Sequence, residues 1–299
     1  MSPRPTRPSR AVARGRRSGR TAWGAALCLL ALPAAAQDRP RTDAAKLTPS
    51  KIILVGDSTM APMSGWAGMF CAHHVKSSTA CLNLGRGGRS TRSYRQEGSW
   101  DVALAEARVP GYRATYVLIQ FGHNDQSSVP ERWTDLTTEF GPNLRRMVTE
   151  VRAAGAIPVL LTPLTRREFK GGTLVNTLEP WSAAVRTVAA EMTVPLVDLN
   201  ARSAALVQQL GAERATALAQ VPPTAEELAA ARTGTTLKPR AAEQARLPDV
   251  PTRPDGPRGQ FTRKFDYTHV GDVGATAFAK LVADSLATAV PALRGEIAP

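Results

Sequence analysis

A serine, an aspartate and a histidine occupy positions from which they could act together in acyl transfer. Ser58 comes shortly after residues 51–55, a short and mostly aliphatic run that ends at a glycine. Such a run is typical of a buried strand, so Ser58 is predicted at the carboxyl edge of a sheet and near a helix N-terminus. Asp266 and His269 are three residues apart, ahead of the last helical stretch. A serine nucleophile needs a histidine base and a carboxylate that orients this base, and the three residues supply that set.

Two further positions could stabilise the oxyanion that forms when a serine attacks an ester. The Gly-rich loop around Gly88 offers backbone N–H groups, and Asn124 follows the most convincing strand of the chain. With the N–H of Ser58, they could form an oxyanion hole. Each position also has a plainer explanation: Gly88 can belong to a flexible turn, Asn124 and Asp125 can form a turn pair, and a serine can cap a helix. His123 is predicted to support the Asn124 loop.

Apolar runs alternate along the chain with stretches of helical spacing. Five runs are predicted as strands, over residues 51–55, 79–84, 114–121, 156–162 and 194–199. Helices are predicted over 66–75, 100–108, 135–154, 174–192, 201–220 and 270–289, and a basic loop over 164–173. Strands that alternate with helices indicate an α/β domain with a parallel sheet covered on both faces.

Residues 1–36 have the pattern of a signal peptide. Seven arginines and no acid in residues 1–20 precede an apolar run too short for a comfortable membrane span, and residues 34–36 are alanines. We predict cleavage after Ala36 and a secreted or periplasmic protein without stable membrane insertion; the export route, Sec or twin-arginine, stays open. Loss of the seven arginines lowers the formal net charge from +13 to +6. This charge does not indicate a nucleic-acid partner and mildly favours an acidic polymer.

The mature chain has about 260 residues, enough for one domain with a sizeable core. Residues 37–50 are predicted as a linker, 51–290 as the domain and 291–299 as a tail. Residues 221–264 are rich in Pro, Arg and Ala, and are predicted as an insertion that is mobile or packed over the surface, with a possible helix at 224–231. The oligomeric state is not indicated.

Cysteine usage fits an exported protein. Cys71 and Cys81 remain when Cys28 leaves with the signal peptide, and an even pair permits a disulfide. Two buried thiols are the alternative. No metal or other cofactor is predicted, because neither cysteine has the neighbours of a metal site and the adjacent His73 and His74 point to different faces of a helix.

Taken together, the polar positions resemble a known family. They form four blocks, Gly56-Asp57-Ser58, Gly88, Gly122-His123-Asn124-Asp125 and Asp266-Tyr267-Thr268-His269. In this order the blocks look like those of the SGNH hydrolases. The residues around them, including Gly65-Trp66 and the run from Gly88 to Tyr94, resemble rhamnogalacturonan acetylesterases of carbohydrate esterase family 12. The resemblance extends over about residues 51–289.

This resemblance implies a flavodoxin-like three-layer α/β/α sandwich and metal-free serine catalysis. It implies Ser58, Asp266 and His269 as catalytic residues, and the N–H groups of Ser58 and Gly88 with the Asn124 amide as the oxyanion hole. The implied activity is the removal of acetyl groups from plant cell-wall polysaccharide, above all pectic rhamnogalacturonan, through an acetyl-enzyme. The alternatives are an SGNH esterase for acetylxylan, peptidoglycan O-acetyl groups, a lipid or a thioester, and a glycan-binding relative without turnover.

Arg89, Arg92 and Trp66 are candidates for contact with the polysaccharide. The two arginines could meet a uronate carboxylate. Trp66 could stack on a sugar ring, as could Trp100, Trp133 and Trp181. Solvated arginines and tryptophans packed in the core are the alternatives. The long segment at 221–264 departs from the family pattern and leaves the choice of substrate open.

Overall fold

The computed structural model describes residues 48–237 and 264–298. The predicted signal peptide, residues 37–47 of the predicted linker and residues 238–263 of the predicted insertion lie outside the described residues. No helix in the described part is long and apolar enough to cross a membrane.

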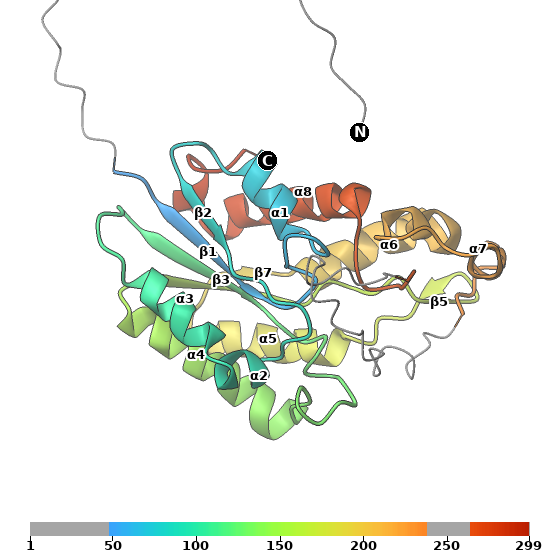
Figure 1. Ribbon diagram of the computed structural model, residues 1–299, viewed down its shortest axis with the longest axis horizontal. Coiled ribbons are helices and arrows are strands. Elements are labelled where there is room, and N and C mark those ends of the chain that lie inside the picture. The colour runs from blue at the N-terminus through green and yellow to red at the C-terminus, as the bar shows by residue number, and fades with distance from the viewer. Residues whose placement is uncertain (1–47, 238–263, 299) are drawn as a thin grey trace, which may run out of the picture. The chain divides into compact units, whose positions relative to one another are not determined.

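A parallel five-stranded sheet forms the centre of the domain (Figure 1). Its strands are β1 (Lys51–Gly56), β2 (Ala80–Asn83), β3 (Thr115–Gln120), β4 (Ile157–Leu161) and β7 (Leu196–Val197). They are ordered β2-β1-β3-β4-β7, and every neighbouring pair is parallel. All five predicted strands are therefore confirmed, although β7 is shorter than predicted. The carboxyl ends of the strands meet at one edge, where the polar blocks of the sequence follow.

Alternate residues of the central strands face opposite helical layers. In β1, Ile52 and Leu54 belong to one apolar cluster, whereas Ile53 and Val55 belong to the other. The first cluster is covered by α1 (Ala67–Met69), η1 (Phe70–His74), α6 (Leu199–Ala215) and α8 (Asp272–Ala289). The second is covered by α3 (Ser99–Ala107), α4 (Gly141–Ala153) and α5 (Glu179–Glu191). The predicted three-layer α/β/α sandwich is confirmed (Figure 1).

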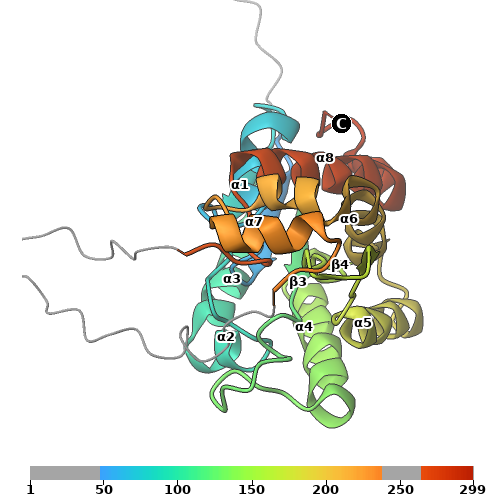
Figure 2. The same ribbon diagram turned by 90° about the vertical axis from the view of Figure 1, so that its right-hand side faces the viewer.

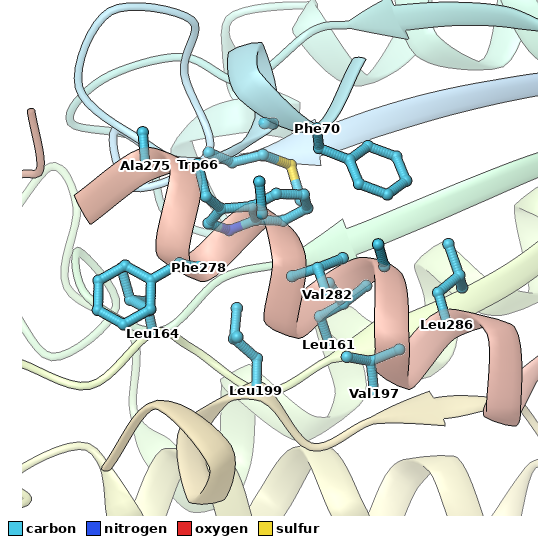
Figure 3. Close-up of a cluster of buried hydrophobic side chains, with 14 of the residues drawn as sticks. Trp66, Phe70, Leu161, Leu164, Val197, Leu199, Ala275, Phe278, Val282 and Leu286 are labelled. Atoms are coloured by element: carbon cyan, nitrogen blue, oxygen red, sulfur yellow. The ribbon is translucent and has the colours of Figure 1, made fainter. Parts of the chain in front are cut away.

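The core beneath α8 is built on aromatic side chains. Trp66, Phe70 and Phe278 are fully buried and gather beside this helix (Figure 3). The rings of Trp66 and Phe70 meet edge to face, with centroids 5.8 Å apart. This packing fixes α8 against the sheet, and with it the residues that precede the helix.

The helix predicted over 174–192 begins only at Glu179. Pro180 lies in its first turn, where a missing N–H removes no intrahelical hydrogen bond. The preceding residues instead form a short antiparallel hairpin of β5 (Phe169–Lys170) and β6 (Thr173–Leu174). Part of the segment predicted as a loop is therefore a strand.

The described part of the predicted insertion packs on the domain. A capping box between Thr224 and Glu227 starts α7 (Ala225–Arg232), within which Ala231 is buried. This helix lies beside α6, to which Arg232 is joined by an ion pair with Glu213 of 2.8 Å (Figure 2). Short helical segments complete the fold: α2 (Ser93–Gln96), η2 (Leu136–Phe140), η3 (Thr216–Leu218) and η4 (Pro291–Leu293).

The segment after residue 290, predicted as a tail, is packed against the domain. Leu293 and Ile297 are buried, and Ile297 pairs with Val75 in an isolated antiparallel bridge. Cys71 and Cys81 form a disulfide with 5.6 Å between their Cα atoms, so the bridged alternative is the one found. The bond joins η1 to the edge strand β2, and a loop of this length contributes roughly 2–3 kcal/mol.

Candidate active site

Ser58, His269 and Asp266 lie in one hydrogen-bonded chain. His269 Nε2 is 2.8 Å from Ser58 Oγ, and its Nδ1 is 2.8 Å from Asp266 Oδ2. The side chains of His269 and Asp266 are 30% and 19% exposed, so these hydrogen-bonded groups are partly accessible to solvent. A hydroxyl, an imidazole and a carboxylate in this order can raise the nucleophilicity of the serine.

Asp266 is held by its own loop. Its Oδ1 accepts hydrogen bonds from the backbone N–H groups of Thr268 (2.7 Å) and His269 (2.6 Å), which leaves Oδ2 for the imidazole. Burial alone would raise the pKa of Asp266, but the hydrogen bonds and the charge of His269 outweigh it and lower the pKa below its ordinary value. The carboxylate therefore stays charged beside the ring.

Ser64 couples the serine loop to the histidine loop. Its hydroxyl donates to the carbonyl of Ser58 (2.7 Å), and its own carbonyl accepts from the N–H of Val270 (3.0 Å). Ser58 follows β1, whereas His269 precedes α8, so this one residue joins the two segments that must meet. The serine and histidine are thereby positioned by backbone as well as by side chains.

Three N–H groups lie on the loops that follow β1, β2 and β3 at the carboxyl edge of the sheet. In the part of the chain that the structure describes, the backbone N–H groups of Ser58 and Gly88 have no acceptor. Gly88 has φ of +78°, a conformation that side chains with a Cβ rarely adopt. The amide of Asn124 donates one hydrogen bond to the Arg89 carbonyl (3.0 Å), which leaves its second N–H free to turn to a ligand. These donors are the predicted oxyanion set.

A buried network supports the serine loop from below. Oδ1 of Asp57 accepts from the N–H and the hydroxyl of Thr59, both at 2.8 Å. Gln120 donates to the Thr59 hydroxyl (2.7 Å) and accepts from the indole N–H of Trp66 (2.9 Å). Trp66 is fully buried (Figure 3), so the prediction that it contacts substrate is wrong. Its ring fills the core, and its N–H satisfies Gln120.

Two buried carboxyl groups flank the site. Asp57 and Asp125 are fully buried, and burial raises their pKa values to about 6 and about 7, although hydrogen bonds from threonines oppose the shifts. Oδ1 of Asp125 accepts from Thr91 N–H (3.0 Å) and from the hydroxyls of Thr91 (2.6 Å) and Thr134 (3.0 Å). Asp125 thus ties three loops together, which is more than the turn pair considered from sequence.

His123 is buried directly before the Asn124 amide. Burial lowers its pKa well below the ordinary value, and the nearby charges of Arg166 and His269 lower it further. Its imidazole is therefore neutral, as suits a residue that packs inside the loop. Its role as a support for Asn124 is consistent with this position.

Sequence reasoning missed Arg167, which holds the Asp266–His269 loop. This side chain is 1% exposed, and its guanidinium donates to the carbonyls of Asp266 (2.8 Å), His269 (2.9 Å) and Thr268 (3.3 Å). Burial lowers its pKa to about 10, which still leaves it charged at neutral pH. It lay within the basic loop predicted at 164–173, and no pattern in that loop distinguishes a buried arginine from a solvated one.

The two arginines predicted to meet substrate have protein partners. Arg89 Nε donates to Glu97 (2.8 Å), and Arg92 pairs with Glu139 (3.8 Å) and also donates to the carbonyl of Pro130. Their contact with substrate stays a prediction. Trp133 is 45% exposed, in contrast to the buried Trp66. Among the described residues, no group of three or more His, Cys, Asp or Glu side chains is placed to hold a metal ion.

The chain is similar to known proteins over most of its length. A family described as the GDSL-like Lipase/Acylhydrolase family matches residues 54–226. The chain belongs to this family. It is 31% identical to the rhamnogalacturonan acetylesterase RhgT of Bacillus subtilis (strain 168) over 246 residues, which cover 80% of this chain and 90% of RhgT. It is 32% identical over 170 residues to the probable rhamnogalacturonan acetylesterase YesY of the same organism, covering 54% of this chain and 76% of YesY.

The fold has a counterpart among solved structures. The crystal structure of the Bacillus subtilis protein YxiM matches this GDSL-like hydrolase with a TM-score of 0.57 at 23% identity, covering 81% of this chain and 57% of the YxiM chain. The predicted resemblance to SGNH hydrolases and to rhamnogalacturonan acetylesterases is therefore confirmed, and so is the predicted fold. As a member of the GDSL-like family, the protein is a carboxylic ester hydrolase.

Proposed function

We propose that this GDSL-like hydrolase is an exported acetylesterase that removes acetyl groups from pectic rhamnogalacturonan. The observation that carries the proposal is the set of hydrogen bonds from Ser58 through His269 to Asp266. The substrate is proposed because RhgT and YesY, whose names state this activity, are 31% and 32% identical to the chain. Ser58, His269 and Asp266 would be the catalytic residues.

In the first half of the reaction, Ser58 Oγ attacks the carbonyl carbon of the acetyl ester, and His269 Nε2 takes the hydroxyl proton. The carbonyl oxygen becomes an oxyanion, which the N–H groups of Ser58, Gly88 and Asn124 stabilise; one such donor is worth about 10²–10³ in rate. The C–O bond to the sugar then breaks, and His269 returns its proton to the departing sugar oxygen. The products are a free sugar hydroxyl and an acetyl group bound to Ser58.

In the second half, water replaces the sugar. His269 takes a proton from the water as it attacks the acetyl carbon, and then delivers this proton to Ser58 Oγ when the acyl bond breaks. Acetate leaves and the serine is restored. Throughout, Asp266 orients the ring through its 2.8 Å contact with Nδ1 and stabilises the imidazolium, because its lowered pKa keeps it charged.

Export is part of the proposal, since pectic polysaccharide lies outside the cytoplasm. It is supported by the charged, apolar and small-residue order of residues 1–36, and by the Cys71–Cys81 disulfide, a bond typical of exported proteins. We expect the mature protein to begin at Gln37. N-terminal sequencing of protein recovered outside the cytoplasm checks this, and a chain that still began at Met1 would contradict it.

The deciding experiment measures acetate released from acetylated rhamnogalacturonan, acetylxylan and a small aryl acetate. The mature wild type is compared with Ser58→Ala, and with Ser77→Ala as a matched control, since Ser77 is exposed in the turn before β2 at the opposite edge of the sheet. We expect release from the pectic polymer that vanishes only in the Ser58 variant. Faster release from acetylxylan would move the substrate to that polymer. Polymer binding without release from any ester would leave a glycan-binding protein.

A further inference from the structure

A guanidinium group lies over the loop that offers the oxyanion donors, yet it takes no part in the hydrogen bonds of the site. A Cβ placed on Gly88 would be 3.3 Å from Cζ and 3.4 Å from Nη2 of Arg132. On the neighbouring Gly87, a Cβ would be 3.7 Å from Cβ of Ser58. The Arg132 head group therefore lies against the same short loop that contacts the serine.

No described residue neutralises the charge of Arg132. Its side chain is exposed, and within residues 48–237 and 264–298 it forms no ion pair and no side-chain hydrogen bond. The other arginines near this loop differ, because Arg89 pairs with Glu97 and Arg92 with Glu139. The donors of Arg132 are thus available to a ligand that approaches the serine.

The backbone beneath Arg132 is held in place. The N–H of Arg132 closes a turn onto the Val129 carbonyl (3.0 Å), and Arg92 donates to the carbonyl of Pro130. Two residues further on, Thr134 is tied to Asp125 by its N–H (3.1 Å) and its hydroxyl (3.0 Å). A guanidinium carried on a fixed turn loses less conformational freedom when it binds than one on a mobile loop.

We propose that Arg132 binds a carboxylate of the polysaccharide close to the acetyl group that is removed, and so selects acidic substrates. The inference rests on the proposed polysaccharide esterase and goes beyond it by naming a residue for the acidic sugar. A guanidinium presents paired N–H donors that match the two oxygens of a carboxylate. The adjacent Trp133, 45% exposed, adds apolar surface beside this charge.

Inhibition of aryl acetate hydrolysis tests this binding separately from deacetylation of the polymer. The probes are an unacetylated rhamnogalacturonan oligosaccharide and the same oligosaccharide with its carboxyl groups reduced to alcohols. For the wild type we expect the acidic probe to have an inhibition constant about tenfold lower than the reduced one. Salt should narrow the difference, because the site is exposed.

Two variants of Arg132 and one control complete the design. Arg132→Gln should raise the inhibition constant of the acidic probe about tenfold, so that the acidic and the reduced probe inhibit almost equally. Arg132→Lys should restore part of the difference between the two inhibition constants. Arg108 is an exposed arginine between α3 and β3, at the opposite edge of the sheet. Arg108→Gln removes the same charge and should keep the wild-type ratio of the two inhibition constants.

Two results would overturn the proposal. Equal inhibition of the wild type by the acidic and the reduced probe would show that no carboxylate is recognised, even if the polymer is deacetylated. A ratio unchanged in Arg132→Gln, with a fall in aryl acetate hydrolysis, would assign the guanidinium to the oxyanion instead. Failure of the wild type to release acetate from rhamnogalacturonan is a separate result, which removes the proposed substrate while the inhibition constants still report on Arg132.

Discussion

At the scale of single residues, Arg167 holds the loop that carries His269, the proposed base. Its three hydrogen bonds to the carbonyls of the Asp266–His269 loop come from the segment after β4, so the histidine is fixed by a second loop as well as its own. Small displacements of a base cost much in rate, since proton transfer needs hydrogen-bond distance. Arg167 is therefore a positioning residue whose effect should appear in turnover.

We predict that Arg167→Met lowers kcat for an aryl acetate by about 10- to 100-fold, with little change in KM. Arg167→Lys should recover part of kcat, because an ammonium group can still donate to the carbonyls. The substitution also leaves buried carbonyls without a donor, at a cost of about 1–3 kcal/mol each, so kcat is measured at a temperature where circular dichroism shows each variant folded. A folded Arg167→Met enzyme with wild-type kcat would contradict the prediction.

The buried carboxyl of Asp125 makes stability depend on pH. Burial raises its pKa to about 7 in the folded protein, whereas in an unfolded chain it has the ordinary value of ~4. Between these values the folded state holds a proton that the unfolded state has lost. The free energy of unfolding should therefore fall as pH rises from about 4 to about 7, by up to ~1.4 kcal/mol per pH unit.

Asp125→Asn isolates this effect. The asparagine keeps an oxygen for the bonds from Thr91 and Thr134 but cannot ionise. Relative to the wild type, the variant should gain stability as pH rises from 5 to 8, as measured by urea unfolding at each pH. A stability difference that is the same at both pH values would show that Asp125 does not carry the pH dependence.

The residues that could be recognised from the sequence are those whose chemistry is local. Ser58 follows a strand, and Asp266 and His269 are separated by one turn. A short segment of the sequence is therefore enough to indicate each of them. Arg167 acts only through carbonyls about a hundred positions away, and Trp66 is an aromatic residue that fits both a core and a sugar surface. The role of such residues depends on whether the tertiary structure buries them, and a single sequence does not show this.

At the scale of elements, Glu150 joins three helices on one side of the sheet. On α4, it accepts from Arg95 of α2 at 2.6 and 3.0 Å, from Trp100 of α3 at 2.5 Å and from Arg146 at 3.0 Å. Burial alone would raise its pKa, but these hydrogen bonds outweigh it and lower the pKa to about 2. The contribution of Glu150 is therefore present above its ordinary pKa of ~4.3 and is lost as pH falls toward 2.

We predict that Glu150→Gln lowers the free energy of unfolding at pH 7 by about 1–2 kcal/mol. An amide has only one oxygen that accepts hydrogen bonds, whereas the carboxylate has two. Chemical denaturation measures the loss, which should shrink between pH 5 and pH 2. In a double-mutant cycle with Arg95→Gln, the two substitutions should be coupled by about 1 kcal/mol. Additive effects would show that the bidentate contact contributes nothing.

Elements were predictable where burial leaves a pattern in the sequence. The aliphatic run of β3 is buried along its whole length, and its strand was predicted within one residue at each end. The start of α5 was misplaced because residues 174–178 continue its helical spacing while the backbone pairs β6 with β5. The four-residue helix α2 was not predicted, since so short a segment has no periodicity.

At the scale of the whole molecule, the two ends of the described domain meet at the edge of the sheet opposite the candidate active site. Glu296 accepts hydrogen bonds from the hydroxyls of Ser50 and Thr79 and forms an ion pair with Arg113. These three partners lie one or two residues ahead of β1, β2 and β3. The strand order itself could be expected only from the family resemblance, because the residues of a buried strand do not specify its neighbour.

Deletion of residues 291–299 should therefore destabilise the protein while sparing its chemistry. It exposes the surfaces that bury Leu293 and Ile297, 0% and 1% exposed, at a cost of about 1.5–3 kcal/mol each. We predict a loss of about 3–6 kcal/mol in urea unfolding, a large share of the 5–15 kcal/mol typical of a domain.

Aryl acetate kcat at low temperature should stay within about twofold, since the Ser58 site is at the other edge of the sheet. The full-length variant Glu296→Gln removes a polar contribution and keeps the apolar ones, so it should lose less unfolding free energy than the truncated protein. If the truncated protein unfolds at the wild-type urea concentration, the segment is dispensable, and the domain ends at α8 as the sequence predicted.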